Sequence, residues 1–172
     1  MKIYVDSEEY KCWHEVGHAT VCLHLGGDVD FIEFLEGDSR GYARARCVDH
    51  PDIERSVACG GLAAEVYLLK NGFAEQAPDD KRDINSVILN NASMDGHAFW
   101  GREYSSEGFT EEETREFVNH AVGSDGNGGL VPIFHLYFSR MQELVRELCD
   151  KRRVEGRQVK ELLRPGNARL KP

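Results

Sequence analysis

The N-terminal quarter of the chain combines helical periodicity with clear start and stop signals. Apolar residues recur at helical spacing after residue 6, and Asp6 followed by Glu9 matches a capping box at a helix start. The pair Gly26-Gly27 is a typical helix end. We therefore predict a helix between these signals, preceded by a short strand over Lys2–Val5.

The next segment has the shorter period of β-structure. Val29–Leu35 and Tyr42–Val48 are runs rich in branched and aromatic residues, and Gly37–Gly41 between them is typical of a turn. This pattern predicts a β-hairpin. The Phe31–Leu35 strand is also a candidate for pairing with an extended peptide, as happens when a ligand adds a strand to a sheet.

The remainder of the chain has mostly helical signals. Helices are predicted from Pro51 to Asn71-Gly72, from a cap at Asp79 or Asp80 to Asn91, from Thr110 with Glu113 to Val122, from Val131 to Arg152, and over Gly156–Leu163. Met94–Ser106 is expected to be irregular. With no internal repeat and no linker, residues 1–172 are expected to form a single domain, mainly α with a small β-hairpin or sheet (α+β).

Composition and charge exclude some classes of function. The 172 residues are 41% hydrophobic and 30% charged, as in ordinary globular proteins, and their net charge is −9. An acidic chain does not suit nucleic acid or an anionic membrane surface. No apolar run has the length of a signal peptide or a membrane span. The five cysteines are scattered without a CxxC pair, which favours a reducing, cytoplasmic location.

The predicted first helix contains the motif His14-Glu15-Val16-Gly17-His18. Histidines four residues apart lie on one helix face, so both imidazoles can reach one zinc ion. In such HExxH sites the glutamate approaches a water on the metal rather than the metal itself, and acts as its base. The sequence therefore predicts a zinc-binding peptidase site with Glu15 as the catalytic residue.

A catalytic zinc needs a third protein ligand, and the residues leave three candidates. His24 has the histidine spacing of metzincins, but that family needs a glycine at the position of Val21, and an unbroken helix carries His24 past the site. Glu65 could be a ligand or could hold a ligand histidine. Asp83 could be a ligand or could supply negative charge at a helix N-terminus.

Several segments together resemble the protease domain of the FtsH-type, AAA-coupled zinc peptidases. The segments are HEVGHATV, Gly41-Tyr42, CGGLAAE, Arg82-Asp83-Ile84-Asn85 and the closing stretch from Arg153 to Leu163. This resemblance implies a zincin-like, mostly helical peptidase domain in which His14, His18 and Asp83 bind one Zn²⁺ and Glu15 is catalytic. It also implies a polypeptide substrate, and it suggests a homo-oligomer and a separate ATPase partner.

The chain departs from that family in three respects. Glu75-Gln76-Ala77-Pro78 replaces the family's threonine-threonine-glycine lead-in to the aspartate, and no segment of these 172 residues resembles the family's membrane anchor or ATPase module. Met94–Ser106 matches nothing in the family pattern. Two alternatives to a self-sufficient peptidase therefore remain. One is a non-proteolytic zinc-binding interaction module that keeps the fold, and the other is a peptidase domain that relies on a separate unfoldase.

Two further patterns bear on the site. Gly17, Gly60 and Gly61 fall inside predicted helices, where glycine costs about 1 kcal/mol, so we expect two helices to cross closely there and to carry Glu65 toward the site. The aromatic residues Phe99-Trp100, Tyr104 and Phe109 belong either to the core or to a substrate groove.

Overall fold

The computed structural model describes residues 2–35, 42–48, 52–106 and 108–164, and its elements are predominantly helical. In chain order they are β1 (Ile3–Tyr4), α1 (Glu8–His24), β2 (Asp28–Leu35), β3 (Tyr42–Val48), α2 (Glu54–Ala58), α3 (Gly60–Lys70), β4 (Ala74–Glu75), α4 (Ile84–Asn91), α5 (Ser93–Phe99), α6 (Glu111–Val122), α7 (Val131–Lys151), β5 (Arg153–Glu155) and α8 (Gly156–Leu163). The predicted class, mainly α with a small β-element, is confirmed.

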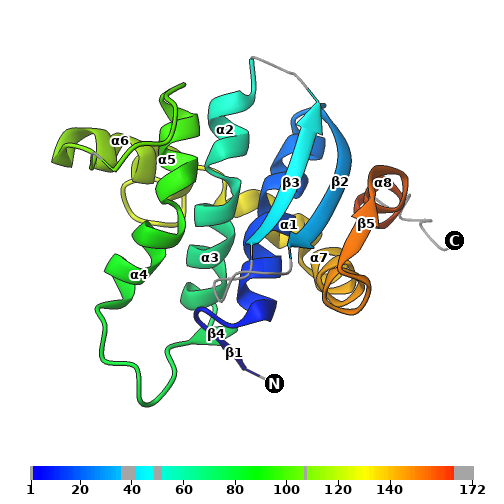
Figure 1. Ribbon diagram of the computed structural model, residues 1–172, viewed down its shortest axis with the longest axis horizontal. Helices are drawn as coiled ribbons and strands as arrows, with labels where there is room; N and C mark the ends of the chain where they lie inside the picture. Colours follow the sequence, from blue (N-terminus) through cyan, green and yellow to red (C-terminus); the bar gives the residue numbers. More distant parts are fainter. Residues whose placement is uncertain (1, 36–41, 49–51, 107, 165–172) are drawn as a thin grey trace, which may run out of the picture.

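Helix α1 lies at the centre of the fold. It is packed between α3, α7 and the sheet, and in Figure 1 it runs behind the β2–β3 hairpin. Because it is covered on several sides, apolar residues occupy most of its circumference, and Trp13, Val16 and Val21 are almost fully buried. The helix that carries the HExxH motif is thus held in place by the core of the domain.

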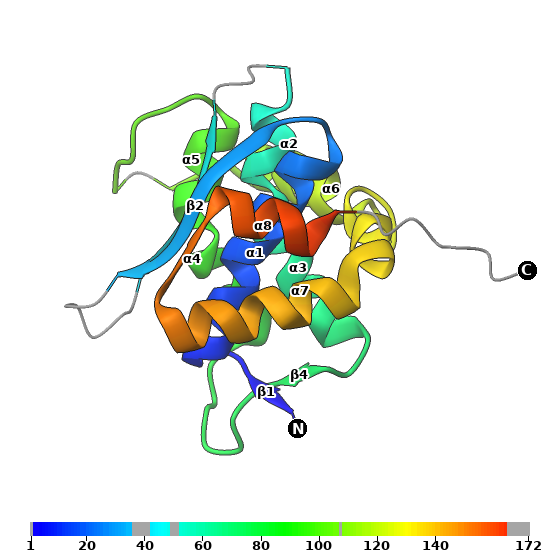
Figure 2. The ribbon, with the colours of Figure 1, turned by 90° about the vertical axis from the view of Figure 1, so that its right-hand side faces the viewer.

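The ring of Phe138 on α7 joins α1 to α3 and to the segment after it. Its centroid lies 5.4 Å from Trp13, 5.6 Å from Tyr67 and 4.4 Å from Phe73. Offset and tilted ring contacts at such distances add to the burial of apolar area. Figure 2 shows α7 crossing in front of α1 and α3, with α8 beside it.

The main sheet has three strands in the order β3-β2-β5, both pairs antiparallel, with a register shift in β2 between Val29 and Phe31. The predicted hairpin is confirmed, and its turn lies outside the described residues. Strand β2 is central, since Phe31–Glu33 pair with β5 on one side and with β3 on the other. The expectation that this strand could accept an extended peptide is therefore wrong over that stretch.

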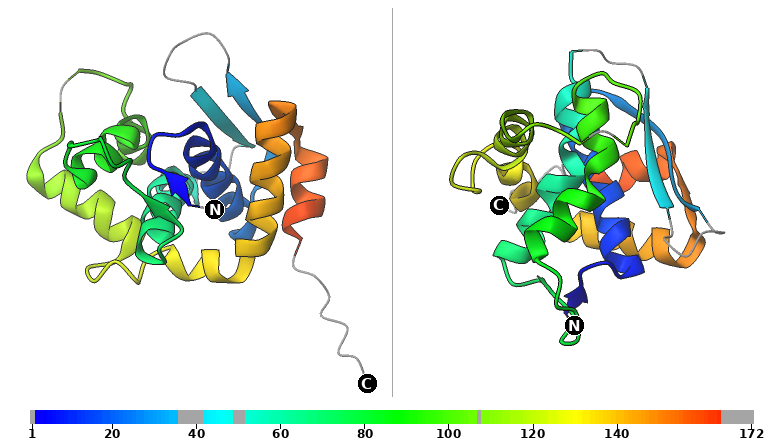
Figure 3. Two further views of the ribbon diagram at one scale, coloured as in Figure 1. Left: turned by 90° about the horizontal axis from the view of Figure 1, so that it is seen from below. Right: turned by 60° about the vertical axis from the view of Figure 1, so that its left-hand side comes forward.

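A second, parallel pair of short strands, β1 and β4, joins the N-terminal segment to the chain after α3. In Figure 3 these strands lie at the same end of the molecule as the start of α1. Helices α4, α5 and α6 lie together on the far side of α2 and α3 from the sheet (Figure 1). Within the described residues, no helix is both long and apolar enough to cross a bilayer.

Several predicted boundaries need correction. The cap of α1 is Ser7, which accepts a hydrogen bond from Tyr10 N at 3.1 Å, whereas Asp6 has a φ of 69° and lies outside the helix. The helix predicted from Pro51 to Asn71 is two helices that meet at Cys59, and Pro51 lies outside the described residues. The capping box Thr110–Glu113 is confirmed.

Two further corrections concern the second half of the chain. Asp83, rather than Asp79 or Asp80, caps α4. The stretch expected to be irregular contains α5, which begins at Ser93 and ends at Phe99. Strand β5 was missed, because three residues acquire strand character only through their pairing with β2.

Candidate metal centre

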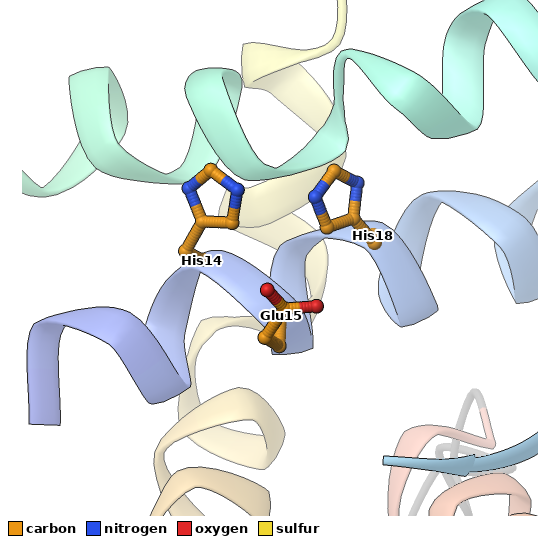
Figure 4. Close-up of side chains that lie close together, drawn as sticks. All are labelled: His14, Glu15 and His18. Carbon is orange, nitrogen blue, oxygen red and sulfur yellow. The ribbon is translucent and has the colours of Figure 1, made fainter. Parts of the chain in front are cut away.

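His14 and His18 lie one turn apart on the same face of α1, under α3 (Figure 4). Their ring centroids are 4.9 Å apart, and each side chain is about nine-tenths buried. Figure 4 shows the carboxylate of Glu15 between the two rings on the near side. One ligand atom from each of the three residues lies within 4.8 Å of the others, so this group could hold a metal ion.

The inner nitrogen of each imidazole is held by a hydrogen-bond acceptor. Nδ1 of His18 donates to the carbonyl oxygen of Val57 at 2.7 Å, and Nδ1 of His14 lies 2.8 Å from Glu65 Oε1. A neutral imidazole that donates through Nδ1 has its lone pair on Nε2. Both histidines therefore present Nε2 as a potential ligand atom, and such anchoring partners are usual for metal-binding histidines.

Glu65 is buried on α3, with 1% of its surface exposed, and its second oxygen accepts a hydrogen bond from Tyr10 Oη at 3.2 Å. Burial raises the pKa of Glu65, although His14 and Tyr10 act in the opposite direction. Burial and the adjacent carboxyl of Glu65 also raise the pKa of Tyr10. These contacts place Glu65 behind His14, where it orients the ring.

Close approach of α1 and α3 creates this arrangement. A methyl group added to Gly17 would lie 2.5 Å from the carbonyl oxygen of Gly60, and one added to Gly61 would lie 2.3 Å from His14 Nε2. Any side chain larger than hydrogen would push the helices apart or displace the ring. The predicted close crossing is confirmed, and it accounts for glycines at positions where they weaken a helix.

The structure also brings Asp95, on α5, to the two imidazoles. Its Oδ2 lies 2.9 Å from His14 Nε2, and its Oδ1 lies 3.4 Å from His18 Nε2. Burial disfavours charge on all three groups, but their mutual attraction outweighs it. The pKa of Asp95 is held well below its usual range, and the pKa values of His14 and His18 are raised. Sequence reasoning missed Asp95 because its segment was expected to be irregular.

The other predicted ligand candidates lie elsewhere. Asp83 is exposed, and its Oδ2 accepts hydrogen bonds from Ser86 N at 2.8 Å and Ser86 Oγ at 2.9 Å. His24, the last residue of α1, has Nδ1 3.4 Å from Tyr137 Oη on α7. Among the described residues, neither joins the group formed by His14, Glu15 and His18.

The aromatic segment divides between the core and a small cavity. Phe99 is buried in the core, and Tyr104 is exposed. Trp100 and Phe109 line a mostly apolar cavity of about 140 Å³, together with Ala92, with Ser93 and Gly96 of α5, and with residues of α4 and α6. The core interpretation is confirmed for Phe99, and the substrate groove stays a prediction.

No protein-family model matches this chain, and no curated protein matches it either. What the fold and site define is a mainly helical domain with a buried group of two histidines and a glutamate that could hold a metal ion. The likeness to FtsH-type peptidases rests on the motifs in the sequence alone.

Proposed function

We propose that the chain is a zinc-dependent peptidase of the FtsH-like, zincin type, in which His14 and His18 hold the ion through Nε2. The observation that carries the proposal is the pairing of each Nδ1 with an acceptor, Glu65 Oε1 for His14 and Val57 O for His18. A surface helix with two chance histidines has no reason to bury and orient both rings. Imidazole nitrogen is a preferred zinc ligand.

Zinc, when bound, polarises a peptide carbonyl and lowers the pKa of a coordinated water toward about 7. Glu15 is the group of this chain that accepts the proton, since its carboxylate lies beside both imidazoles and is only partly buried. It then delivers that proton to the leaving amine. Glu65 keeps His14 in the tautomer that exposes Nε2 throughout.

Extended polypeptide is the substrate class that this fold suits best. In the part of the chain that the structure describes, the outer edge of β3 has no partner strand, because β3 is the end strand of the β3-β2-β5 sheet. Backbone groups on such an edge can pair with an unfolded segment. The pairing would place a peptide alongside α1, which β3 contacts.

The test uses an unfolded protein as substrate. Purified protein loaded with zinc should cleave casein, a chelator should stop it, and Glu15→Gln should lower the rate by orders of magnitude while zinc stays bound. Glu112→Gln, an exposed change on α6, is the matched control and should cleave like the parent. Cleavage by Glu15→Gln at the parent rate would exclude Glu15 as the base.

Two other outcomes separate the rival functions. Zinc binding without cleavage of any unfolded substrate would favour an interaction module. Cleavage of casein, with a stably folded substrate left intact until an ATP-driven unfoldase is added, would favour a peptidase that depends on a separate ATPase.

A further inference from the structure

We propose that Asp95, and not Asp83, is the third protein ligand of the metal; the inference rests on the metal centre proposed above. The geometry points to a site made by α1 and α5, with two imidazole nitrogens and the carboxylate of Asp95 around a single ion. It thereby departs from the ligand set that the sequence motifs imply.

The distances are those of groups that share an ion. Zinc–nitrogen and zinc–oxygen bonds are about 2.0–2.1 Å long, so two ligand atoms on a tetrahedral ion lie about 3.3 Å apart. The carboxylate oxygens of Asp95 lie 2.9 Å from His14 Nε2 and 3.4 Å from His18 Nε2. Each of these two distances, one to each carboxylate oxygen, is within about half an ångström of the spacing of two ligand atoms on one ion.

The orientation of the groups supports the same conclusion. Oδ2 of Asp95 is buried, and within the described residues no donor meets it with hydrogen-bond geometry, although His14 Nε2 is 2.9 Å away. A direct N–H···O bond would be close to linear. Ligand atoms around an ion are instead offset from one another, because each points at the ion. A buried carboxylate needs positive charge beside it, and an ion held between Asp95 and the two Nε2 atoms would supply that charge when the imidazoles are neutral.

Neighbouring contacts hold Asp95 in place. Helix α5 packs against α2, which also supplies the Val57 carbonyl that anchors His18. Helix α2 therefore connects a ligand histidine to the helix that carries the carboxylate. Ligands from two separate helices must be held in place by neighbouring contacts, and α2 provides such contacts to both helices.

The carboxylate of Asp83 is already engaged as a helix cap. It caps α4 through Ser86, a task that stabilises a helix by about 0.5–2 kcal/mol. The resemblance to FtsH-type peptidases is also weakest just before Asp83, where the family's lead-in is replaced by Glu75–Pro78. An aspartate that is already bound as a cap and exposed to solvent is poorly placed to close a buried metal site.

The first experiment measures zinc content by mass spectrometry after gel filtration. Asp95→Ala should lose zinc that the parent retains, and Asp83→Ser, which preserves a capping side chain, should retain it. Circular dichroism of the metal-free proteins shows whether each variant is folded. Asp95→Asn, which keeps the shape of the side chain, serves if Asp95→Ala does not fold.

The second experiment gives a signature that only a ligand can produce. Cobalt(II) is loaded in place of zinc, and Asp95→Cys should add a thiolate-to-cobalt charge-transfer band in the near ultraviolet that the parent and Asp83→Cys lack. Two results would overturn the assignment to Asp95 and leave the metal centre intact. One is a charge-transfer band in Asp83→Cys alone. The other is zinc that folded Asp95→Ala retains and Asp83→Ser loses. A parent protein that binds neither metal would overturn the proposed function as well.

Discussion

Gly17 on α1 and Gly60 on α3 mark the point where the two helices touch through their backbones. A Cβ on Gly17 would lie 2.5 Å from Gly60 O, and a Cβ on Gly60 would lie 2.8 Å from the Cα of His18. The contact is reciprocal, because each glycine makes room for the helix opposite. It sets the depth at which both imidazoles lie beneath α3.

Gly17→Ala should therefore destabilise the protein, even though alanine is the better helix former. A methyl group forced against backbone cannot be relieved by rotating a side chain, so we expect a loss of about 1–3 kcal/mol in the free energy of unfolding. Gly108→Ala, where a new methyl group meets nothing within 4 Å, should change stability by less than about 0.5 kcal/mol. Urea titrations of the metal-free proteins make the comparison, and equal midpoints would contradict the close contact.

Glu65→Gln should weaken metal binding without abolishing it. The amide oxygen can still accept from His14 Nδ1, but the negative charge that supports a metal-bound imidazole is gone. Partners of this kind typically contribute about 10–100-fold to metal affinity. Competition with a fluorescent zinc chelator measures the change. Tyr10→Phe removes only the hydrogen bond to the far oxygen of Glu65 and should weaken zinc affinity less than Glu65→Gln does. A larger loss of affinity in Tyr10→Phe would show that Glu65 does not act through its charge.

His24→Ala should retain all of its metal. The His24 ring lies edge-on to Tyr137, with centroids 5.7 Å apart, and its Nδ1 is directed to that phenol. His18→Ala, in contrast, removes one of the two proposed nitrogen ligands and should lose the ion. Elemental analysis of both variants side by side makes the comparison. Metal lost from His24→Ala and kept in His18→Ala would point to a different histidine arrangement.

Acid should destabilise the protein partly through His120. Burial and the nearby Arg55 lower the pKa of this imidazole, and Glu116 opposes them only weakly. The unfolded chain therefore binds this proton more tightly than the native protein, so stability falls as the pH drops below the ordinary histidine value of about 6.5.

His120→Gln removes that titration but keeps a group that can bond to Ser56, whose Oγ lies 3.0 Å from His120 Nε2. Between about pH 7.5 and about pH 5.5 the parent should lose more stability than the variant. Urea titrations with chelator present at both pH values isolate this effect. Parallel curves would show that the His120 pKa is unchanged by folding.

Sequence patterns predicted the part of the site that depends on local periodicity. His14, Glu15 and His18 lie within one helix, and a helix of regular amphipathic pattern places them on neighbouring positions whatever surrounds it. The glycines on α1 and α3 also predicted a close crossing. These features require no knowledge of the rest of the fold.

Asp95 could not be predicted in this way. Helix α5 is short, contains Gly96, and follows Ala92, which provides no side-chain cap, so its sequence carries no start signal. It forms because α2, α4 and α6 surround it. For the same reason the cap of α4 was misplaced: Asp79, Asp80 and Asp83 are equivalent in local sequence, and only the folded structure selects one of them.

The contact between Trp13 and Phe138 has a consequence for synthesis on the ribosome. Helix α1 emerges before α7, and the ring that stacks on Trp13 belongs to α7, more than half the chain later. Until α7 has left the exit tunnel, the nascent chain exposes a large indole and the apolar side of α1. Such surfaces attract chaperones and promote aggregation. The helix with the HExxH motif is thus made well before the helix that completes its burial.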